Sequence, residues 1–340
     1  HVNKDEIVPI WKRQIAPVIT SDPIKSKEGR IFFTTKDGNI HEVFLNSDNQ
    51  ICYRILAYEK TDGNVSPLYV PKDDGYFVTI NKNNKLNLLD SVTGWKKNWQ
   101  PAIPKGKIGK PVYGKGTIFI STNKGIFGLS LKNGKKNYLE FSEFKNSRFL
   151  SEPVFYKDSI LIGNNNGSLY QLKLSQSDTI PYLQKTWSYK TEAPIKGKLL
   201  LHKGKVYFGS QDNSLYALDL KRKKLIWNFK TNAPVQSKPV IHNNTIYFGS
   251  HDRFFYALDL KSGSLIWKKR LLGKIKSSPL VINDRVYIGS MAGILHAYNA
   301  KTGDNFWEIQ LCSPIISSPI KLGNYILVGS SAFIYVLEEE

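Results

Sequence analysis

Residue types that most often carry out chemistry are few in this chain, and they lie far apart. The chain has six histidines and two cysteines in 340 residues. No histidines have the short spacing of a metal-binding motif. Asp252 follows His251 directly, but neighbouring residues of a strand point to opposite faces. Cys52 and Cys312 are far apart in sequence, and we expect them to be unbonded. No glycine-rich phosphate loop is present, so the sequence predicts no catalytic, cofactor-binding or metal-binding residue.

The formal net charge of +20 is the strongest compositional signal. Lysine supplies most of it, whereas arginine is the residue of bidentate guanine and phosphate recognition. We therefore expect no specific nucleic-acid partner. An acidic protein, an anionic membrane face and a merely solvated surface remain alternatives. No apolar run is long enough for a transmembrane helix, and the polar start at His1 suits a mature or trimmed chain.

A repeat of 40 residues organises the chain. Three consecutive copies span residues 191–230, 231–270 and 271–310. The repeated tryptophans are Trp187, Trp227, Trp267 and Trp307, and the repeated glycines, each followed by serine, are Gly209, Gly249, Gly289 and Gly329. Repeats of this length indicate a solenoid or a propeller.

Each copy is predicted to form four short strands. In the copy at 231–270 we expect strands at 235–241, 245–249, 254–260 and 265–269, because β-branched and aromatic residues alternate between Asn, Asp and Gly turns. No segment has helical periodicity. Four strands with two apolar faces must stack against neighbours, and radial stacking gives a β-propeller.

Counting the strands predicts how the repeat ends meet. A proline marks the innermost strand of nearly every copy, and eight innermost strands can be found, but only seven outermost strands follow them. The missing strand lies around Trp11 at the N-terminus. The prediction is an all-β, eight-bladed propeller of four-stranded antiparallel blades, closed by the N-terminal strand. We expect one domain, 1–340, with blades near 15–55, 56–101, 102–141, 142–190, 191–230, 231–270, 271–310, and 311–337 plus 7–14.

Residues 257–267 (ALDLKSGSLIW) and 299–307 (NAKTGDNFW) resemble the repeat of the quinoprotein-like, or PQQ-like, propeller family. The resemblance covers nearly the whole chain and implies eight blades with tryptophans docked between neighbours. The predicted docking residues are Trp11, Trp99, Trp187, Trp227, Trp267 and Trp307.

The family contains both enzymes and scaffolds. The family's quinone-dependent dehydrogenases are longer chains with a disulfide between adjacent cysteines, a tryptophan platform and a Ca²⁺ site. These features are not visible in the present sequence. Its compact, cofactor-free members are scaffolds of outer-membrane β-barrel assembly. The resemblance therefore implies a monomeric, extracytoplasmic, non-catalytic scaffold without a cofactor, whose partner is a protein, acidic or part of a membrane-embedded assembly. The alternatives are a propeller that binds a small anion, a quinone-dependent enzyme, and a sensor domain of a larger membrane protein.

The candidate binding site is a set of basic residues on or beside the innermost strands. Residues two apart on a strand share a face, so we expect their side chains to project together into a positive funnel for a partner or an anion. The candidates are Lys107, Lys110, Arg148, Lys196, Lys198, Lys238, Lys274, Lys276 and the loop residue Arg253.

Overall fold

The computed structural model describes residues 9–15, 18–19, 21–56, 68–70, 76–80, 86–90, 96–97, 109, 111–122, 125–130, 136–137, 148–149, 151–175 and 182–339. Every regular element in this part of the chain is a β-strand. None of these residues forms a helix that could cross a membrane. The chain divides into two compact units, the first made of 1–66 and 237–340 and the second of 67–236.

The first unit holds four of the eight four-stranded sheets. Its first sheet contains β2 (Ile24–Lys25), β3 (Ile31–Thr34), β4 (Ile40–Leu45) and β5 (Ile51–Leu56). The next contains β22 (Val240–His242), β23 (Thr245–Gly249), β24 (Phe254–Asp259) and β25 (Leu265–Arg270). It is followed by β26 (Leu280–Ile282), β27 (Arg285–Gly289), β28 (Ile294–Asn299) and β29 (Asn305–Gln310). The last contains β30 (Ile320–Leu322), β31 (Tyr325–Gly329), β32 (Phe333–Glu338) and β1 (Trp11–Gln14).

The second unit holds the other four sheets. They are β6 (Leu68–Val70), β7 (Tyr76–Ile80), β8 (Leu86–Asp90) and β9 (Lys96–Lys97); then β10 (Val112–Gly114), β11 (Thr117–Thr122), β12 (Gly125–Ser130) and β13 (Lys136–Asn137). The remaining two are β14 (Val154–Tyr156), β15 (Ser159–Gly163), β16 (Ser168–Ser175) and β17 (Tyr182–Lys190); and β18 (Leu200–His202), β19 (Lys205–Gly209), β20 (Ser214–Asp219) and β21 (Lys224–Lys230).

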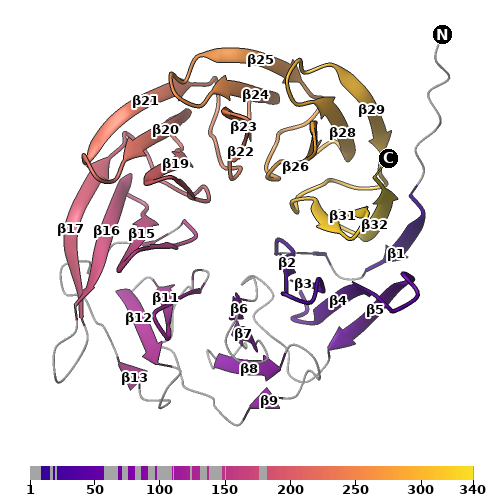
Figure 1. Cartoon of the computed structure of the whole chain (residues 1–340), viewed down its shortest axis with the longest axis horizontal. Coiled ribbons are helices and arrows are strands. Elements are labelled where there is room, and N and C mark those ends of the chain that lie inside the picture. Colours follow the sequence, from indigo (N-terminus) through magenta and orange to yellow (C-terminus); the bar gives the residue numbers. More distant parts are fainter. Residues whose placement is uncertain are drawn as a thin grey trace. The chain divides into compact units, whose positions relative to one another are not determined.

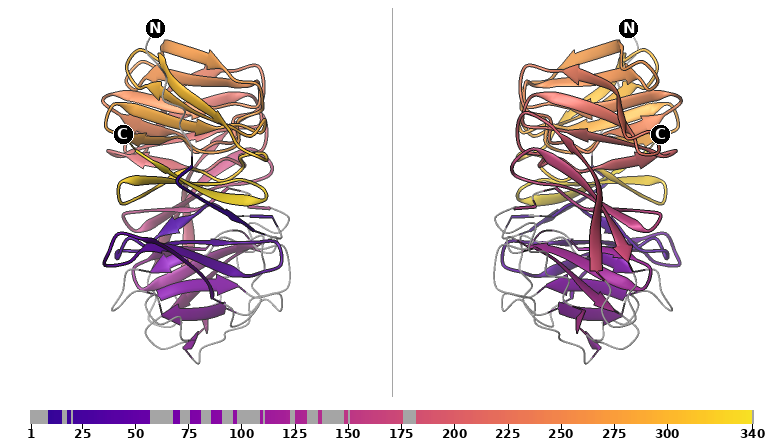
Figure 2. Two further views of the ribbon diagram at one scale, coloured as in Figure 1. Left: turned by 90° about the vertical axis from the view of Figure 1, so that its right-hand side faces the viewer. Right: turned by 90° about the vertical axis from the view of Figure 1, so that its left-hand side faces the viewer.

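The predicted fold class is confirmed: the sheets are the four-stranded antiparallel blades of an eight-bladed propeller. The N-terminal strand completes the last blade, as the strand count predicted. β1 pairs with β32 in antiparallel register, with Trp11 opposite Val336 (Figure 1). The orange and yellow sheets of the first unit are visibly twisted (Figure 2), as paired strands of L-residues must be.

The innermost strands are shorter than predicted. In the copy at 231–270 the strand expected at 235–241 is β22, which begins only at Val240. The hydroxyl of Ser237 explains the difference, because it both accepts from the amide of Gly249 at 2.8 Å and donates to its carbonyl at 2.9 Å. A side chain thus replaces the strand ladder. The predicted funnel residues Lys196, Lys198, Lys238, Lys274 and Lys276 therefore lie in the crossover before an innermost strand and not on the strand itself.

A β-bulge, which the sequence does not reveal, shapes the outermost strands. Register shifts in the same place in four successive sheets, for example between Ala257 and Leu258, where Ala257 lies opposite Trp267 and Leu258 opposite Leu265. The residue before each tryptophan has no partner in the strand ladder. Such bulges bend a strand and make its open edge a poor template for further pairing.

The hydrophobic core lies between neighbouring sheets. In one cluster Tyr247 and Trp267 pack with Ile288 and Tyr298 of the following sheet. The conserved spacing of the repeated glycine has a packing reason here, because a Cβ on Gly249 would lie 2.1 Å from the Cγ2 of Ile275. The glycine lets the crossover to the next sheet approach the backbone closely.

Candidate functional site

The predicted basic residues are divided between the two units. Lys107 and Lys110 lie outside the described residues, as does Trp99. In the second unit are Arg148, Lys196 and Lys198; in the first are Lys238, Arg253, Lys274 and Lys276. The convergence of the whole set into one funnel stays a prediction.

Lys198 differs from the sequence-based expectation of a residue that is available to a partner. Its ammonium lies 3.4 Å from the carboxylate of Glu152, and its side chain is only 20% exposed. Lys196, two residues earlier, is exposed. The two lysines therefore lie in different environments, and an ion pair within the protein engages one of them.

A compact cationic group forms where the β23–β24 loop meets the crossover into β26. Lys274 and Lys276 are both exposed. Burial lowers the pKa of the nearby His251 imidazole, and the charges of Lys276 and Lys274 lower that pKa further. The opposing charge is that of Asp252, whose oxygens accept from the Tyr256 hydroxyl at 2.7 Å and the Phe254 amide at 2.9 Å. That carboxylate is therefore committed to holding the loop.

Arg253 is strained in a way that its counterparts in other copies avoid. Its φ is +73°, in the left-handed region, where the neighbouring copies have Asn213 and Gly293. Left-handed backbone disfavours residues with a large side chain. Its side chain is nevertheless exposed. An arginine retained at such a position is a reason to look for a role outside the fold.

An apolar side chain lies within the same loop pair. Leu272 is 74% exposed, more than any other large hydrophobic side chain in the described part of the chain. We define the crossover cluster as His251, Arg253, Leu272, Lys274 and Lys276. The repeat does not demand these residues: proline occupies the position of Lys274 in the copies on either side, at Pro234 and Pro314. Sequence reasoning found the cations but missed Leu272, although the same disagreement between copies marks it.

The predicted docking tryptophans within the described part of the chain lie in or beside the cores between sheets. Trp267 is 8% exposed, and its indole N–H donates to the Ala300 carbonyl of the following sheet at 3.1 Å. Trp187 and Trp307 pack against clusters that join successive sheets. Trp11 packs against the cluster that joins the first and last sheets. Trp227 is 8% exposed and lies 5.9 Å from the Tyr207 ring.

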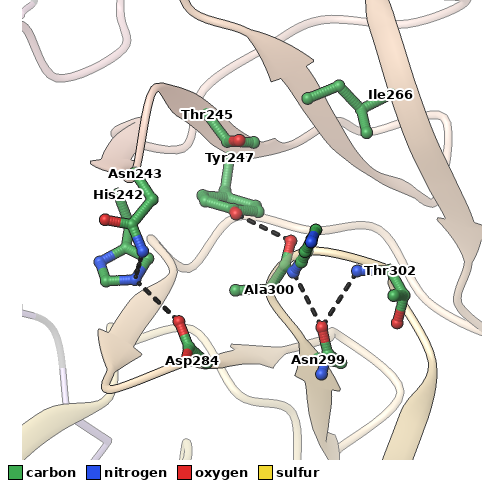
Figure 3. A pocket seen from close by; sticks show the side chains of 10 residues that line it. His242, Asn243, Thr245, Tyr247, Ile266, Asp284, Asn299, Ala300 and Thr302 are labelled. Carbon is green, nitrogen blue, oxygen red and sulfur yellow. Dashed lines mark hydrogen bonds and ion pairs between the residues drawn. The ribbon is translucent and has the colours of Figure 1, made fainter.

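A cavity of about 410 Å³ opens at the other end of the β22–β25 sheet. Figure 3 shows its polar groups turned toward one another: His242 lies 3.4 Å from Asp284, and the Tyr247 hydroxyl donates to the Ala300 carbonyl at 2.8 Å. At the equivalent place in the following sheet pair, Arg285 lies over the Phe306 ring at 5.1 Å. The cavity therefore exists because smaller residues occupy the corresponding positions in this copy. Its hydrogen-bonding groups bond to one another and do not point toward a common centre where a ligand could bind.

Groups suited to metal or redox chemistry are not gathered in the described part of the chain. No group of three or more His, Cys, Asp or Glu side chains there is placed to hold a metal ion. Cys52 and Cys312 are both free. Cys312 accepts a hydrogen bond from the Lys12 ammonium at 3.1 Å.

These sheets and their order define a protein of the eight-bladed β-propeller class. A family model described as "Outer membrane protein assembly factor BamB" matches residues 9–229 and 224–333. The chain belongs to this family, which is the PQQ-like resemblance identified from the repeats.

Three solved structures of the same fold have little sequence in common with the chain. BamB from Moraxella catarrhalis is 15% identical, with a TM-score of 0.75 over 98% of this chain and 97% of that one. The computationally designed protein Ika8 is 16% identical, with a TM-score of 0.73 over 96% and 98%. Sqt1 from Saccharomyces cerevisiae is 12% identical, with a TM-score of 0.75 over 98% of each chain. At these identities the likeness shows the fold alone. No curated protein matches the sequence.

Proposed function

We propose that the protein is a non-catalytic interaction scaffold of the cell envelope, and that the crossover cluster binds an acidic segment of a membrane-embedded protein assembly. Membership of the BamB family supports the envelope location and the scaffold role. The observation that carries the binding site is the cluster itself, in which exposed cations lie on the same two loops as a 74% exposed leucine.

The physical case rests on how interfaces gain affinity and specificity. An apolar anchor supplies affinity when a partner buries it, and the surrounding charges select the partner and speed its approach. Leu272 fits the first role, and Lys274, Lys276 and Arg253 fit the second. A segment with carboxylates around one apolar side chain is complementary to this arrangement. Loops presented by a rigid sheet scaffold are a common place for such sites.

Site-specific photo-crosslinking in the native envelope tests this proposal. A photoreactive residue at Leu272 is expected to crosslink to an outer-membrane assembly protein. The same residue at Leu265, which is 44% exposed on an outermost strand, is the matched control and is expected not to crosslink to it. Adding Lys274→Glu and Lys276→Glu should reduce the crosslink at least tenfold, because like charges then face the partner.

Two results would count against the proposal. Equal crosslinking from Leu272 and Leu265 would show that the cluster is not the docking surface. An absorbance change on adding a quinone and Ca²⁺ to the purified protein would favour the quinone-dependent enzyme and remove the scaffold assignment.

A further inference from the structure

The turn between β20 and β21 carries the densest positive charge in the sequence of the repeats. Residues 221–224 are Lys-Arg-Lys-Lys, and all four are exposed. The equivalent turns in the next two copies are Lys-Ser-Gly-Ser at 261–264 and Lys-Thr-Gly-Asp at 301–304. The fold thus needs none of the additional cations.

Lys223 shows that these cations are kept against a conformational preference. Its φ is +56°, whereas the equivalent residues are Gly263 at +73° and Gly303 at +74°. Glycine adopts this left-handed conformation without cost, and a lysine does not. The backbone strain is borne by a residue whose side chain is exposed. An observed outlier of this kind is a reason to infer a function.

The carboxylate of Asp219 lies among these cations, and the hydrogen bond from the Arg222 amide, together with the charges of Arg222 and Lys205, helps to lower its pKa. Lys203 and Lys205 belong to the adjacent hairpin, where Lys205 lies opposite Asp219. Asp219, the acidic residue of the turn, accepts the amides of Lys221 at 2.9 Å and Arg222 at 2.8 Å. Its carboxylate therefore holds the turn. Lys223 reaches the preceding sheet and donates to the Thr186 carbonyl at 3.4 Å, and the residue before Thr186 is the exposed Lys185.

Two aliphatic side chains follow the cations directly. Leu225 is 42% exposed and Ile226 is 37% exposed. Leu225 lies opposite Leu218, Trp227 lies opposite Ala217, and Ile226 is the unpaired residue of the bulge. The bulge removes Ile226 from the ladder of the outermost strand. Cations next to exposed aliphatic side chains suit the boundary of a bilayer, where phosphate head groups lie above acyl chains.

We propose that residues 221–226, together with Lys185, Lys203 and Lys205, form a docking surface for an anionic lipid bilayer. Charge complementarity chooses the occupant: lysines act as point charges toward head-group phosphates, and the aliphatic pair enters the apolar boundary. This surface lies at the end of its sheet that bears the β18–β19 and β20–β21 turns. It shares no residue with the crossover cluster, and it does not depend on the proposed scaffold function.

Vesicle sedimentation of the full chain tests the docking surface. The probe is vesicles of phosphatidylcholine mixed with phosphatidylglycerol, and vesicles of phosphatidylcholine alone are the reference. The wild type should bind the anionic vesicles only. Replacing residues 221–224 by Gln should weaken binding by at least about a hundredfold, since each charge near the surface contributes roughly fivefold.

A control variant with the same net charge distinguishes an effect of this docking surface from an effect of the protein's overall charge. Gln replacements of Arg253, Arg270, Lys274 and Lys276, all exposed, remove the same charge from the first unit. This control should keep vesicle binding and lose the Leu272 crosslink. Equal loss of vesicle binding in both variants would overturn the docking surface and leave a bulk charge effect. Failure of the wild type to bind anionic vesicles at low salt, or a preference for duplex DNA over them, would also overturn it.

Two smaller variants guard against a fold defect. Lys223→Gly relieves the left-handed strain, so its melting temperature should not fall, yet its vesicle binding should weaken about fivefold. Replacing Leu225 and Ile226 by Ser should make the remaining binding disappear at high salt, because only the charges are screened. Unchanged binding in Lys223→Gly would contradict the role assigned to that residue.

Discussion

At the scale of single residues, a buried histidine links the first sheet to the N-terminal strand. His41 is 2% exposed and stacks on the Phe33 ring at 5.1 Å. One ring nitrogen lies 2.6 Å from the Tyr53 hydroxyl and the other 3.0 Å from the Thr35 hydroxyl. The Arg13 guanidinium of β1 lies 4.1 Å from the Tyr53 ring. Burial lowers the pKa of His41 from 6.5 to about 4, and the charge of Arg13 contributes in the same direction.

This histidine should make stability depend on pH. Between about pH 4 and 6.5 the unfolded chain binds a proton that the folded chain refuses. The stabilisation is therefore fully present above pH 6.5 and is lost as the pH falls toward 4, by roughly 3 kcal/mol. Urea unfolding of the wild type and of His41→Phe across this range measures the effect. Phe suits the position because Phe127 occupies it in another sheet. Identical pH slopes for the two proteins would refute the assignment.

At the scale of the blade, a serine hydroxyl replaces the backbone hydrogen bonds that would otherwise extend the innermost strand. Ser237 is fully buried, and its hydroxyl satisfies both the amide and the carbonyl of Gly249. Ser277 and Ser317 repeat the contact with Gly289 and Gly329, each at 2.7 Å to the carbonyl. In the sequence, the repeated Gly-Ser pairs identify the glycine of this contact but not the distant serine whose hydroxyl bonds to it.

Removing that hydroxyl should lower the free energy of unfolding, although the substitution deletes only one oxygen atom. Ser237→Ala leaves a buried amide and a buried carbonyl without partners, which costs about 1–3 kcal/mol. The exposed Ser264→Ala is the control and should change the free energy of unfolding by less than about 0.5 kcal/mol. Urea denaturation of both variants decides the point. Equal effects would mean that Ser237 is not needed for the crossover.

At the scale of the whole chain, the N-terminal strand stabilises the last sheet by pairing with its edge. β1 supplies the fourth strand of the sheet that ends at β32. Trp11 packs against both the first and the last sheet, 6.3 Å from the Tyr53 ring. Its loss would leave β32 as an open edge and uncover apolar side chains.

Deleting residues 1–14 should therefore lower the free energy of unfolding by about 3 kcal/mol or more, the usual cost of truncating a packed tryptophan. A synthetic peptide of residues 9–15, added in trans, should restore part of the lost thermal stability, while a scrambled peptide should not. A truncated chain that melts at the wild-type temperature would show that β1 does not fasten the last sheet.

Much of the architecture could be predicted because the same pattern of turn and apolar residues recurs in copy after copy. Trp267 and its counterparts set the period, and the missing outermost strand pointed to Trp11. The bounds of the innermost strands could not be predicted, because a hydroxyl of Ser237 replaces backbone pairing, and periodicity registers only which residues are apolar. The cations of the crossover cluster could be found from the sequence, but the pairing of Lys198 with Glu152, which is remote in sequence, could not.

By itself, the sequence determined the strand type, the four-stranded unit, its repetition and the place of the N-terminal strand, because turn residues and apolar alternation act over short distances. Only the tertiary structure decided which charges are engaged and which face the solvent. Lys196 and Lys198 are two residues apart in one crossover, yet the Lys198 ammonium lies 3.4 Å from the Glu152 carboxylate and Lys196 is exposed. Burial and pairing of charges depend on contacts between segments far apart in the chain. For that reason the exposed Leu272, the strained Arg253 and the left-handed Lys223 became visible only in three dimensions.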